Sequence, residues 1–279
     1  MYSIPLTRIK IHIAKLLYKL VKLFGQPDVQ IIRRKNISYE VDLSEGIDLA
    51  IFLFGEFQSH LLKQSDMKIA QNAIIFDVGA NIGDTTLKFA NQFPESQVFA
   101  FEPTDFAWKK LLRNIELNPD LSTSITPVKC FLSDTNCEEA EMIAYASWKL
   151  VHNSEKSHHY HGGLASSAVA TPSIRLDTFI EENRISRVDL LKIDTDGHEV
   201  SVLRGAIQTL QNFKPYLIIE VGQYTLHEEN SSFIDVWNIL KECGYSRIIN
   251  SQNGKEINLQ NYKNIIPEKA TIDIIAYPG

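Results

Sequence analysis

The sequence has few cysteines. There are three in 279 residues, at Cys130, Cys137 and Cys243, and no two of them form a Cys-x-x-Cys pair. An odd number without paired spacing argues against a disulfide framework and favours free thiols in a reducing compartment. The chain also lacks an apolar run near the roughly 18 residues of a membrane-spanning helix, and it lacks a signal-peptide pattern. These absences predict an intracellular, cytoplasmic protein.

The sequence has no excess of positive charge. It contains 28 Lys and Arg residues and 34 Asp and Glu residues, which gives a net charge of −6. A chain with this balance has no global basic field, so we expect no nucleic-acid partner. Apolar residues make up 44% and charged residues 22% of the chain, as in an ordinary globular protein. A chain of this length is expected to form one α/β domain with additions.

A short strand followed by a glycine turn is the feature around which the chain is organised. Residues 74–76 are apolar, Asp77 ends this run, and Gly79 and Gly83 bracket a tight turn before a helix. Glycine lets the backbone approach a ligand closely, and a helix N-terminus favours anionic groups. The spacing Asp-x-Gly-x-x-x-Gly differs from the Gly-x-Gly-x-x-Gly of dinucleotide dehydrogenases, so an NAD-dependent oxidoreductase is the weaker alternative.

The next predicted strand, residues 97–101, ends in Glu102-Pro103. An acid at the end of the second strand, about 20 residues past the glycines, suits the two hydroxyls of a ribose. The sequence therefore predicts a nucleoside site between these two strand ends.

A cluster of ionisable side chains follows the predicted strand at residues 188–193. It falls where parallel strands end, which is where ligands bind in open α/β sheets. Acids that stabilise a helix N-terminus would account for Asp196 or Glu199, but not for Lys192. We therefore predict a catalytic group made of Lys192, Asp194, Asp196, His198 and Glu199.

These three blocks, Asp77 to Gly83, Glu102-Pro103 and Val188 to Ala206, together resemble the FkbM-type family of class I methyltransferases that use S-adenosylmethionine (SAM). The resemblance covers roughly residues 40 to 277. It implies a Rossmann-like α/β fold, with a seven-stranded, mostly parallel sheet in the order 3-2-1-4-5-7-6 and helices on both faces. Family members more often have Glu where this chain has Asp196, so the role of that residue is open.

The resemblance also implies SAM as the cofactor and S-adenosylhomocysteine as its product. Ser133 and Asp134 follow the expected third strand (residues 125–132), where a carboxylate could face the adenine or only cap a turn. Glu56 belongs to a Gly-Glu segment that would pack over the cofactor. The residues implied in cofactor binding are Asp77, Gly79, Ala80, Asn81, Gly83, Glu102, Pro103, Ser133, Asp134 and Glu56.

The implied reaction is O-methylation of a hydroxyl on a sugar or a glycosylated small molecule. We expect Asp194 to orient the acceptor and His198 to remove its proton, with Lys192 holding Asp194 ionised. Two alternatives remain open: a nitrogen, lipid or protein acceptor, and a non-catalytic SAM-binding scaffold. No metal ligands are predicted, and a metal requirement is left open.

Three segments follow from these patterns. Residues 1–27 form a basic amphipathic helix, which either lies on an anionic membrane or packs on the domain or a second subunit. Residues 28–70 form an extension that packs on the core. Within it, residues 33–35 read as a turn and residues 47–62 as a helix. Residues 71–279 form the methyltransferase domain.

A His-rich loop at residues 148–167 interrupts the methyltransferase domain. We expect it to be a loop or hairpin over the acceptor pocket, with a disordered insertion or a zinc site as alternatives. Its histidines are His152, His158, His159 and His161.

Overall fold

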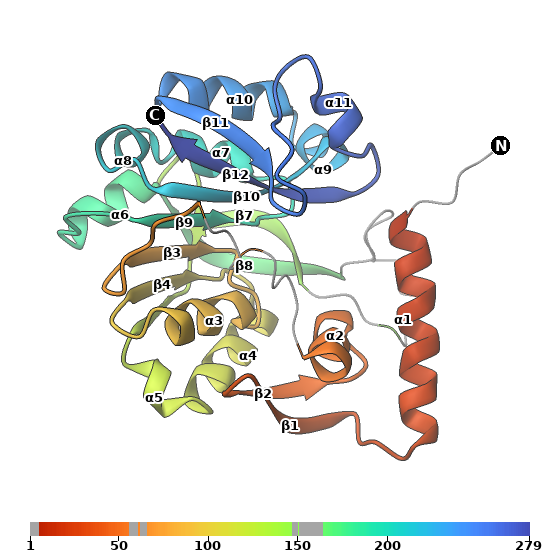
Figure 1. Cartoon of the computed structure of the whole chain (residues 1–279). Coiled ribbons are helices and arrows are strands. Elements are labelled where there is room, and N and C mark those ends of the chain that lie inside the picture. The colour runs from red at the N-terminus through yellow and green to blue at the C-terminus, as the bar shows by residue number, and fades with distance from the viewer. Residues whose placement is uncertain (1–5, 56–60, 62–65, 147–149, 151–163) are drawn as a thin grey trace.

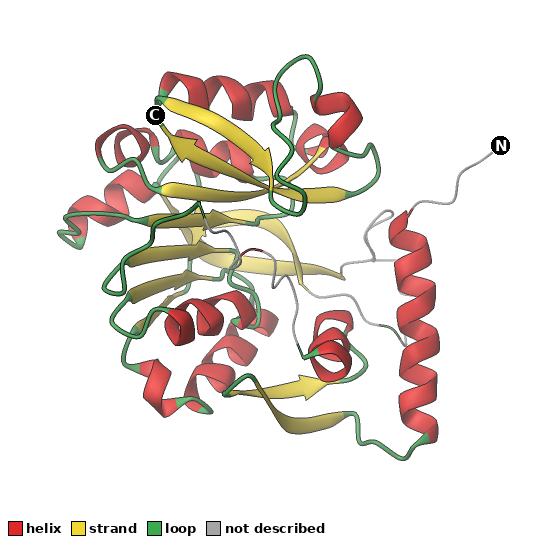
Figure 2. Cartoon of the chain, viewed as in Figure 1, coloured by secondary structure: helices red, strands yellow, loops and turns green. Residues whose placement is uncertain are grey.

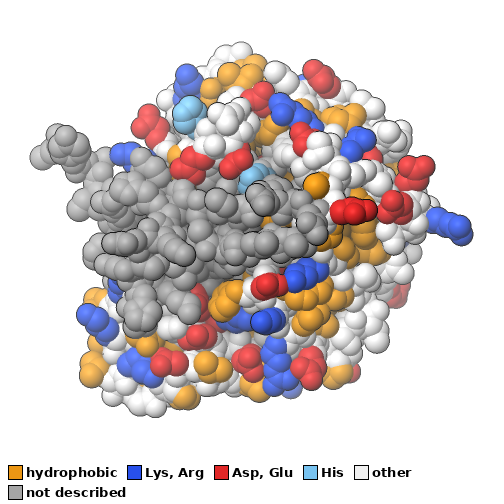
Figure 3. Space-filling model, turned by 180° about the vertical axis from the view of Figure 1, so that it is seen from behind, with side chains coloured by type: hydrophobic (Ala, Val, Ile, Leu, Met, Phe, Trp, Pro, Cys, Tyr) orange, Lys and Arg blue, Asp and Glu red, His pale blue; other side chains and the backbone are white. Residues whose placement is uncertain are grey.

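The computed structural model describes residues 6–55, 61, 66–146, 150 and 164–279. A central β-sheet has helices on both of its faces, and the long helix α1 (Leu6–Leu23) stands at one side of the molecule (Figure 1). On the face seen in Figure 3, lysine and arginine side chains of the described residues are interspersed with acidic ones.

The main sheet has seven strands in the order β11-β12-β10-β9-β3-β4-β5, and all except β12 run parallel. Numbered by their order along the chain within this sheet, the strands follow 3-2-1-4-5-7-6, so the predicted fold class is confirmed. The strand bounds are β3 (Ile74–Val78), β4 (Gln97–Phe101), β5 (Ile125–Val128), β9 (Leu190–Ile193), β10 (Tyr216–Gly222), β11 (Tyr245–Asn250) and β12 (Thr271–Pro278).

Successive strand residues point to opposite faces of this sheet, and each face has its own apolar core. Phe76 belongs to one core, whereas its neighbour Ile75 belongs to the other. Helices of both layers are visible in Figure 2. The first core includes α6 (Leu176–Glu182), α7 (Glu199–Arg204), α8 (Ile207–Asn212), α9 (Gln223–Glu228) and α10 (Phe233–Glu242). The second includes α1, α2 (Gly46–Phe54), α3 (Asp84–Gln92) and α4 (Asp105–Glu116). Two short helices, α5 (Pro119–Ser122) and α11 (Tyr262–Ile265), complete the set.

The N-terminal extension is a hairpin of β1 (Val29–Arg34) and β2 (Ile37–Asp42) followed by α2. Two asparagines hold the edge of β2. Asn118 exchanges hydrogen bonds with the backbone of Ser38 (2.7 and 2.8 Å), and the Asn114 side chain accepts from the backbone N–H of Glu40 (2.9 Å). These bonds join the extension to the layer that carries α4.

Two boundaries in the extension differ from prediction. The predicted turn at residues 33–35 is wrong, because β1 continues to Arg34 and the turn is formed by Lys35 and Asn36, whose φ angles are 46° and 69°. The helix predicted to run to residue 62 ends at Phe54, because Gly55 adopts a left-handed conformation (φ 74°) and donates its N–H to the carbonyl of Ile51.

Between β5 and β9 in the sequence, the chain forms a second sheet of three strands. Its order is β6 (Phe131–Leu132), β8 (Leu164–Ile174), β7 (Cys137–Ala146). The expected third strand at residues 125–132 is therefore too long, because β5 ends at Val128 and residues 131–132 pair with β8. His152, His158, His159 and His161 lie outside the described residues, as does most of the loop at 148–167.

Candidate active site

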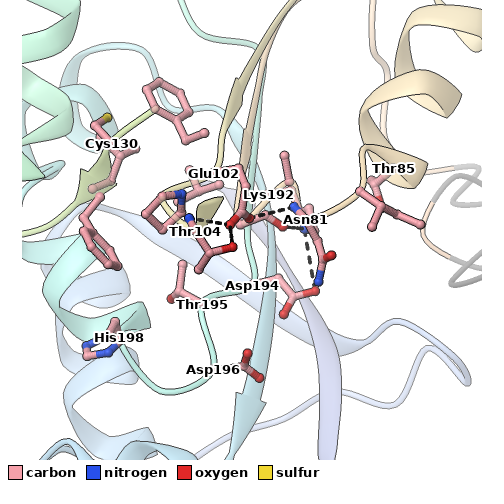
Figure 4. A pocket seen from close by; sticks show the side chains of 18 of the residues that line it. Asn81, Thr85, Glu102, Thr104, Cys130, Lys192, Asp194, Thr195, Asp196 and His198 are labelled. Carbon is pink, nitrogen blue, oxygen red and sulfur yellow. Dashed lines mark hydrogen bonds and ion pairs between the residues drawn. The ribbon is translucent and has the colours of Figure 1, made fainter. Parts of the chain in front are cut away.

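A pocket lies at the carboxyl ends of β3, β4 and β9 (Figure 4). It has an empty volume of about 870 Å³, part of which is open to solvent. The predicted residues that line it are Gly79, Ala80, Asn81, Glu102, Pro103, Lys192, Asp194, Asp196 and His198. Residues 79–82 and residues 192–198 thus come together although more than 100 positions separate them.

Gly79 is required where the first and fourth strands end. Its φ is +75°, and a Cβ on this residue would lie 1.8 Å from the carbonyl oxygen of Asp194. Glycine is therefore needed here so that the two strand ends can meet. Gly83 also has a positive φ (85°), and its missing Cβ leaves room for Leu111. Gly83 is not among the residues that line the pocket.

Glu102 is held in place by three donors. One oxygen accepts from the N–H (2.9 Å) and the hydroxyl (2.5 Å) of Thr104, and the other accepts from the N–H of Asn81 (2.9 Å). Burial raises the pKa of the Glu102 carboxyl, and the bonds from Thr104 and Asn81 act against this rise. The second oxygen accepts only one of these bonds, so it keeps a lone pair for a hydroxyl donor.

Asn81 presents an open acceptor. The residue adopts a left-handed conformation (φ 51°), which Asn tolerates better than most residues. Its side-chain oxygen is buried and has no hydrogen-bond partner among the described residues. A buried polar atom without a partner costs free energy, so this oxygen is a site for a donor on a bound ligand.

Lys192 links the carboxyl ends of β3 and β9. Its ammonium lies 2.9 Å from Asp77 and 3.6 Å from Asp194, and it donates to the carbonyl of Gly79 (3.0 Å). Burial alone would lower the pKa of Lys192, but the charges of Asp77 and Asp194 outweigh burial and the pKa is raised. The other oxygen of Asp77 accepts from Thr86 (2.6 Å), so Asp77 supports the pocket without lining it.

Glu199 shapes the turn that precedes it. One carboxylate oxygen accepts from the N–H and hydroxyl of Thr195 and from the N–H of Gly197, each at 3.0 Å. The side chain is buried and does not line the pocket, and its hydrogen bonds hold the turn in place. The catalytic role of Glu199 stays a prediction.

Acidic side chains gather on one side of the pocket. Asp196 lies on the turn in a left-handed conformation (φ 52°), and burial together with Asp194 and Glu199 raises its pKa well above the usual value. Glu220, at the end of β10, stands opposite Asp273 of β12 in the register. Burial and the neighbouring charges of Asp194 and Asp273 likewise raise the pKa of Glu220. Asp194 and Asp196 line the pocket and Glu220 does not, and a cationic ligand would relieve the repulsion among these carboxylates.

His198 enters the pocket from the start of α7 and has a partner on its far side. Its Nδ1 lies 3.4 Å from a carboxylate oxygen of Glu229, which follows α9. An Nδ1–H directed at Glu229 would leave Nε2 as the acceptor nitrogen of the ring. The arrangement suits a general base.

Another wall of the pocket is apolar. It is formed by residues that precede the predicted Ser133 and Asp134. It contains Phe101 and residues 130–132, and burial raises the pKa of the Cys130 thiol to about 12. Ser133 and Asp134 do not line the pocket, because the chain leaves the main sheet here and both contact Ser201 of α7. That Asp134 faces an adenine stays a prediction, with the capping of a turn as its alternative. Glu56 lies outside the described residues.

Several lining residues were not predicted. Thr104 could have been found from its place beside Glu102-Pro103, and Asp84 and Thr85 from the helix start after the glycines. The apolar members carry no signal beyond their hydrophobicity. The full set is Ile47, Val78, Ile82, Asp84, Thr85, Phe101, Thr104, Cys130, Phe131, Leu132 and Thr195.

In the described part of the chain, no three His, Cys, Asp or Glu side chains are grouped so as to hold a metal ion.

Similarity to known proteins agrees with this geometry. Residues 77–247 match the model of a family described as the methyltransferase FkbM domain. The chain is 28% identical over 162 residues to Methyltransferase sdnD of Sordaria araneosa, covering 49% of this chain and 61% of that protein. It is 24% identical over 151 residues to Hexuronic acid methyltransferase AglP of Haloferax volcanii, covering 54% of this chain and 56% of that protein.

The crystal structure of Methyltransferase FkbM from Methylobacillus flagellatus superposes with a TM-score of 0.52 and 16% identity, covering 77% of this chain and 46% of that one. This likeness shows a shared fold. In each of these three comparisons the match spans less than two thirds of the other protein.

Proposed function

Because the chain belongs to the FkbM methyltransferase family, we propose that it transfers a methyl group from SAM to a hydroxyl of a sugar or glycosylated small molecule. The observation that carries the proposal is that Glu102 and Asn81 line the same pocket as Asp194 and His198. The first pair suits a nucleoside, and the second suits acid–base chemistry.

The pocket residues fit SAM. The free lone pair of Glu102 can accept from a ribose hydroxyl. The unpartnered oxygen of Asn81 can accept from a polar hydrogen of the cofactor, and the apolar wall at residues 130–132 can cover the adenine. Bound SAM supplies an electrophilic methyl group on a sulfonium. The carboxylates of Asp194 and Asp196 attract its positive charge.

The chain's own residues then prepare the acceptor. Nε2 of His198 removes the hydroxyl proton, and Glu229 stabilises the imidazolium that results. The Asp194 carboxylate orients the hydroxyl, with Lys192 behind it keeping the carboxylate in place. The pocket walls limit the access of water to the reacting atoms.

Similarity to a protein named for hexuronic acid supports a sugar acceptor. The histidine and carboxylates that line the pocket can form hydrogen bonds with several hydroxyl groups, which suits a polyhydroxy substrate.

Titration calorimetry tests the cofactor first, with SAM, S-adenosylhomocysteine and NAD as ligands. We expect the wild type to bind the first two and not NAD, and Glu102→Ala to lose this binding. Glu95→Ala removes an exposed carboxylate and should bind like the wild type. Binding of NAD alone, or of none of the three, would contradict the proposal. Transfer of a labelled methyl group to hexuronate glycosides then tests the acceptor.

A further inference from the structure

Helix α1 exposes a stripe of large apolar side chains. Along the helix and its end, positions 13, 16, 20, 23 and 24 recur at the spacing of one helical face. The exposed fractions are 52% for Ile13, 59% for Leu16, 43% for Leu20, 81% for Leu23 and 83% for Phe24. Exposed apolar residues are ordinary when single, but a continuous stripe marks an interaction surface. We call these five residues the outer stripe.

A second apolar stripe on α1 holds the helix to the protein. Val21 is buried, and Ala14, Leu17 and Tyr18 pack against the core that contains α2 and α3. The Tyr18 hydroxyl also donates to Asp28 (2.9 Å). The helix is thus seated by its inner face, and the outer stripe is left facing away from the domain.

The charge of α1 is of one sign. The sequence of the helix contains Arg8, Lys10, Lys15, Lys19 and Lys22 and no acidic residue, in a chain whose net charge is −6. Lys19 is exposed and lies beside Leu16 and Leu20 on the helical surface, whereas Lys22 pairs with Asp28 (3.1 Å). A cationic edge next to an apolar stripe is typical of helices that lie in the headgroup region of anionic bilayers.

We propose that α1 docks the protein on an anionic lipid surface. The outer stripe lies at the boundary between the headgroups and the acyl chains, and Lys19 lies among the headgroups. A second copy of α1 is the poorer occupant, because two such helices would bring like charges together. No helix in the described ranges is long and apolar enough to cross a bilayer.

Docking by α1 would also place the pocket near the lipid. Helix α1 contacts α2, and Ile47 in the first turn of α2 lines the pocket. One helix therefore separates the docking surface from the site. The docking proposal does not depend on the methyl-transfer proposal, because neither the outer stripe nor Lys19 lines the pocket.

Vesicle co-sedimentation of the full chain tests the proposal. The probes are vesicles of phosphatidylcholine alone and of an equal mixture with phosphatidylglycerol, at low and at physiological salt. We expect binding to the mixed vesicles only, weakened by salt. Leu16→Ser/Leu20→Ser should weaken binding roughly 100-fold, and Lys19→Gln about 5-fold.

The matched control is Ile234→Ser/Leu259→Ser, which removes two exposed apolar side chains elsewhere and should bind like the wild type. Thermal unfolding and SAM titration of each variant check that the fold is kept. The proposal is overturned if the wild type does not bind the mixed vesicles, or if Leu16→Ser/Leu20→Ser binds them equally well. It is also overturned if light scattering shows a dimer that this double variant separates, because a second copy would then cover the stripe.

Discussion

Nζ of Lys192 lies 2.9 Å from Oδ1 of Asp77, directly across the register between β9 and β3, and each side chain is at most 4% exposed. The pair joins the two strands whose ends form the floor of the pocket. It is therefore both a structural bond and the support of Asp194 above it.

Asp77→Asn should destabilise the fold by about 3 kcal/mol, because a buried lysine then loses its main counter-charge. Urea unfolding followed by circular dichroism measures the loss. Lys129→Gln removes one partner of an exposed pair with Asp105 and should cost far less. Equal losses of unfolding free energy in the two variants would show that the buried pair stabilises the fold no more than the exposed pair does.

Gly79→Ala should destabilise by about 3 kcal/mol or more, because it adds left-handed strain to a clash with the backbone of Asp194. Gly254→Ala is the control, since Gly254 has a similar φ (+69°) and nothing within 4 Å of the added Cβ. It should cost only about 1 kcal/mol. The difference between the two, from thermal or urea unfolding, isolates the close approach of the strand ends. A difference near zero would argue against that contact.

His198→Gln should lower kcat by roughly 10²–10⁴-fold and leave SAM affinity unchanged, because it removes the base without touching the nucleoside side. Glu229→Gln should cost less, since an amide oxygen can still accept from Nδ1. His227→Gln changes an exposed histidine on α9 and should behave like the wild type. Full turnover in His198→Gln would remove this residue from the mechanism.

Glu220→Gln should raise the melting temperature, and by more at about pH 8 than at about pH 5. Burial and the charges of Asp194 and Asp273 raise the pKa of Glu220 in the folded protein. The Glu220 carboxyl therefore contributes fully to stability below its pKa in the unfolded chain, which is about 4.3. This contribution is lost as the pH rises through the pKa of Glu220 in the folded protein. Glu95→Gln, at an exposed position, should show the same difference at both pH values. A pH-independent gain in Glu220→Gln would refute the argument.

The central strands could be predicted because their apolar runs are short and end in polar residues, as at Ile74–Val78. The inserted hairpin could not. Its strand Cys137–Ala146 contains Glu138, Glu139 and Glu141, which do not suggest a strand. The split of the third strand at Val128 depends on pairing with β8, more than 40 residues away, and no local pattern carries that information.

The residues of the site also divide into those that could be predicted from the sequence and those that could not. Glu102 and Asn81 could be placed because they stand at the ends of predicted elements. The roles of Glu199 and Asp77 could not be distinguished from those of Asp194 and Asp196, because a carboxylate that closes a turn and one that lines a pocket are alike in sequence. Glu229 and Glu220 belong to separate segments, and only the folded chain brings them to the site.

The joining of β3 to β9 has a consequence for synthesis on the ribosome. The backbone N–H of Ile74 donates to the side chain of Asp189, 115 positions later, in the same pairing. At about 5–20 residues per second, the edge of β3 waits roughly 6–23 s for its partner strand. During that time the strand presents unpaired backbone and the apolar Ile75 and Phe76. We therefore expect the nascent chain to need the protection of a chaperone most between the emergence of these two strands.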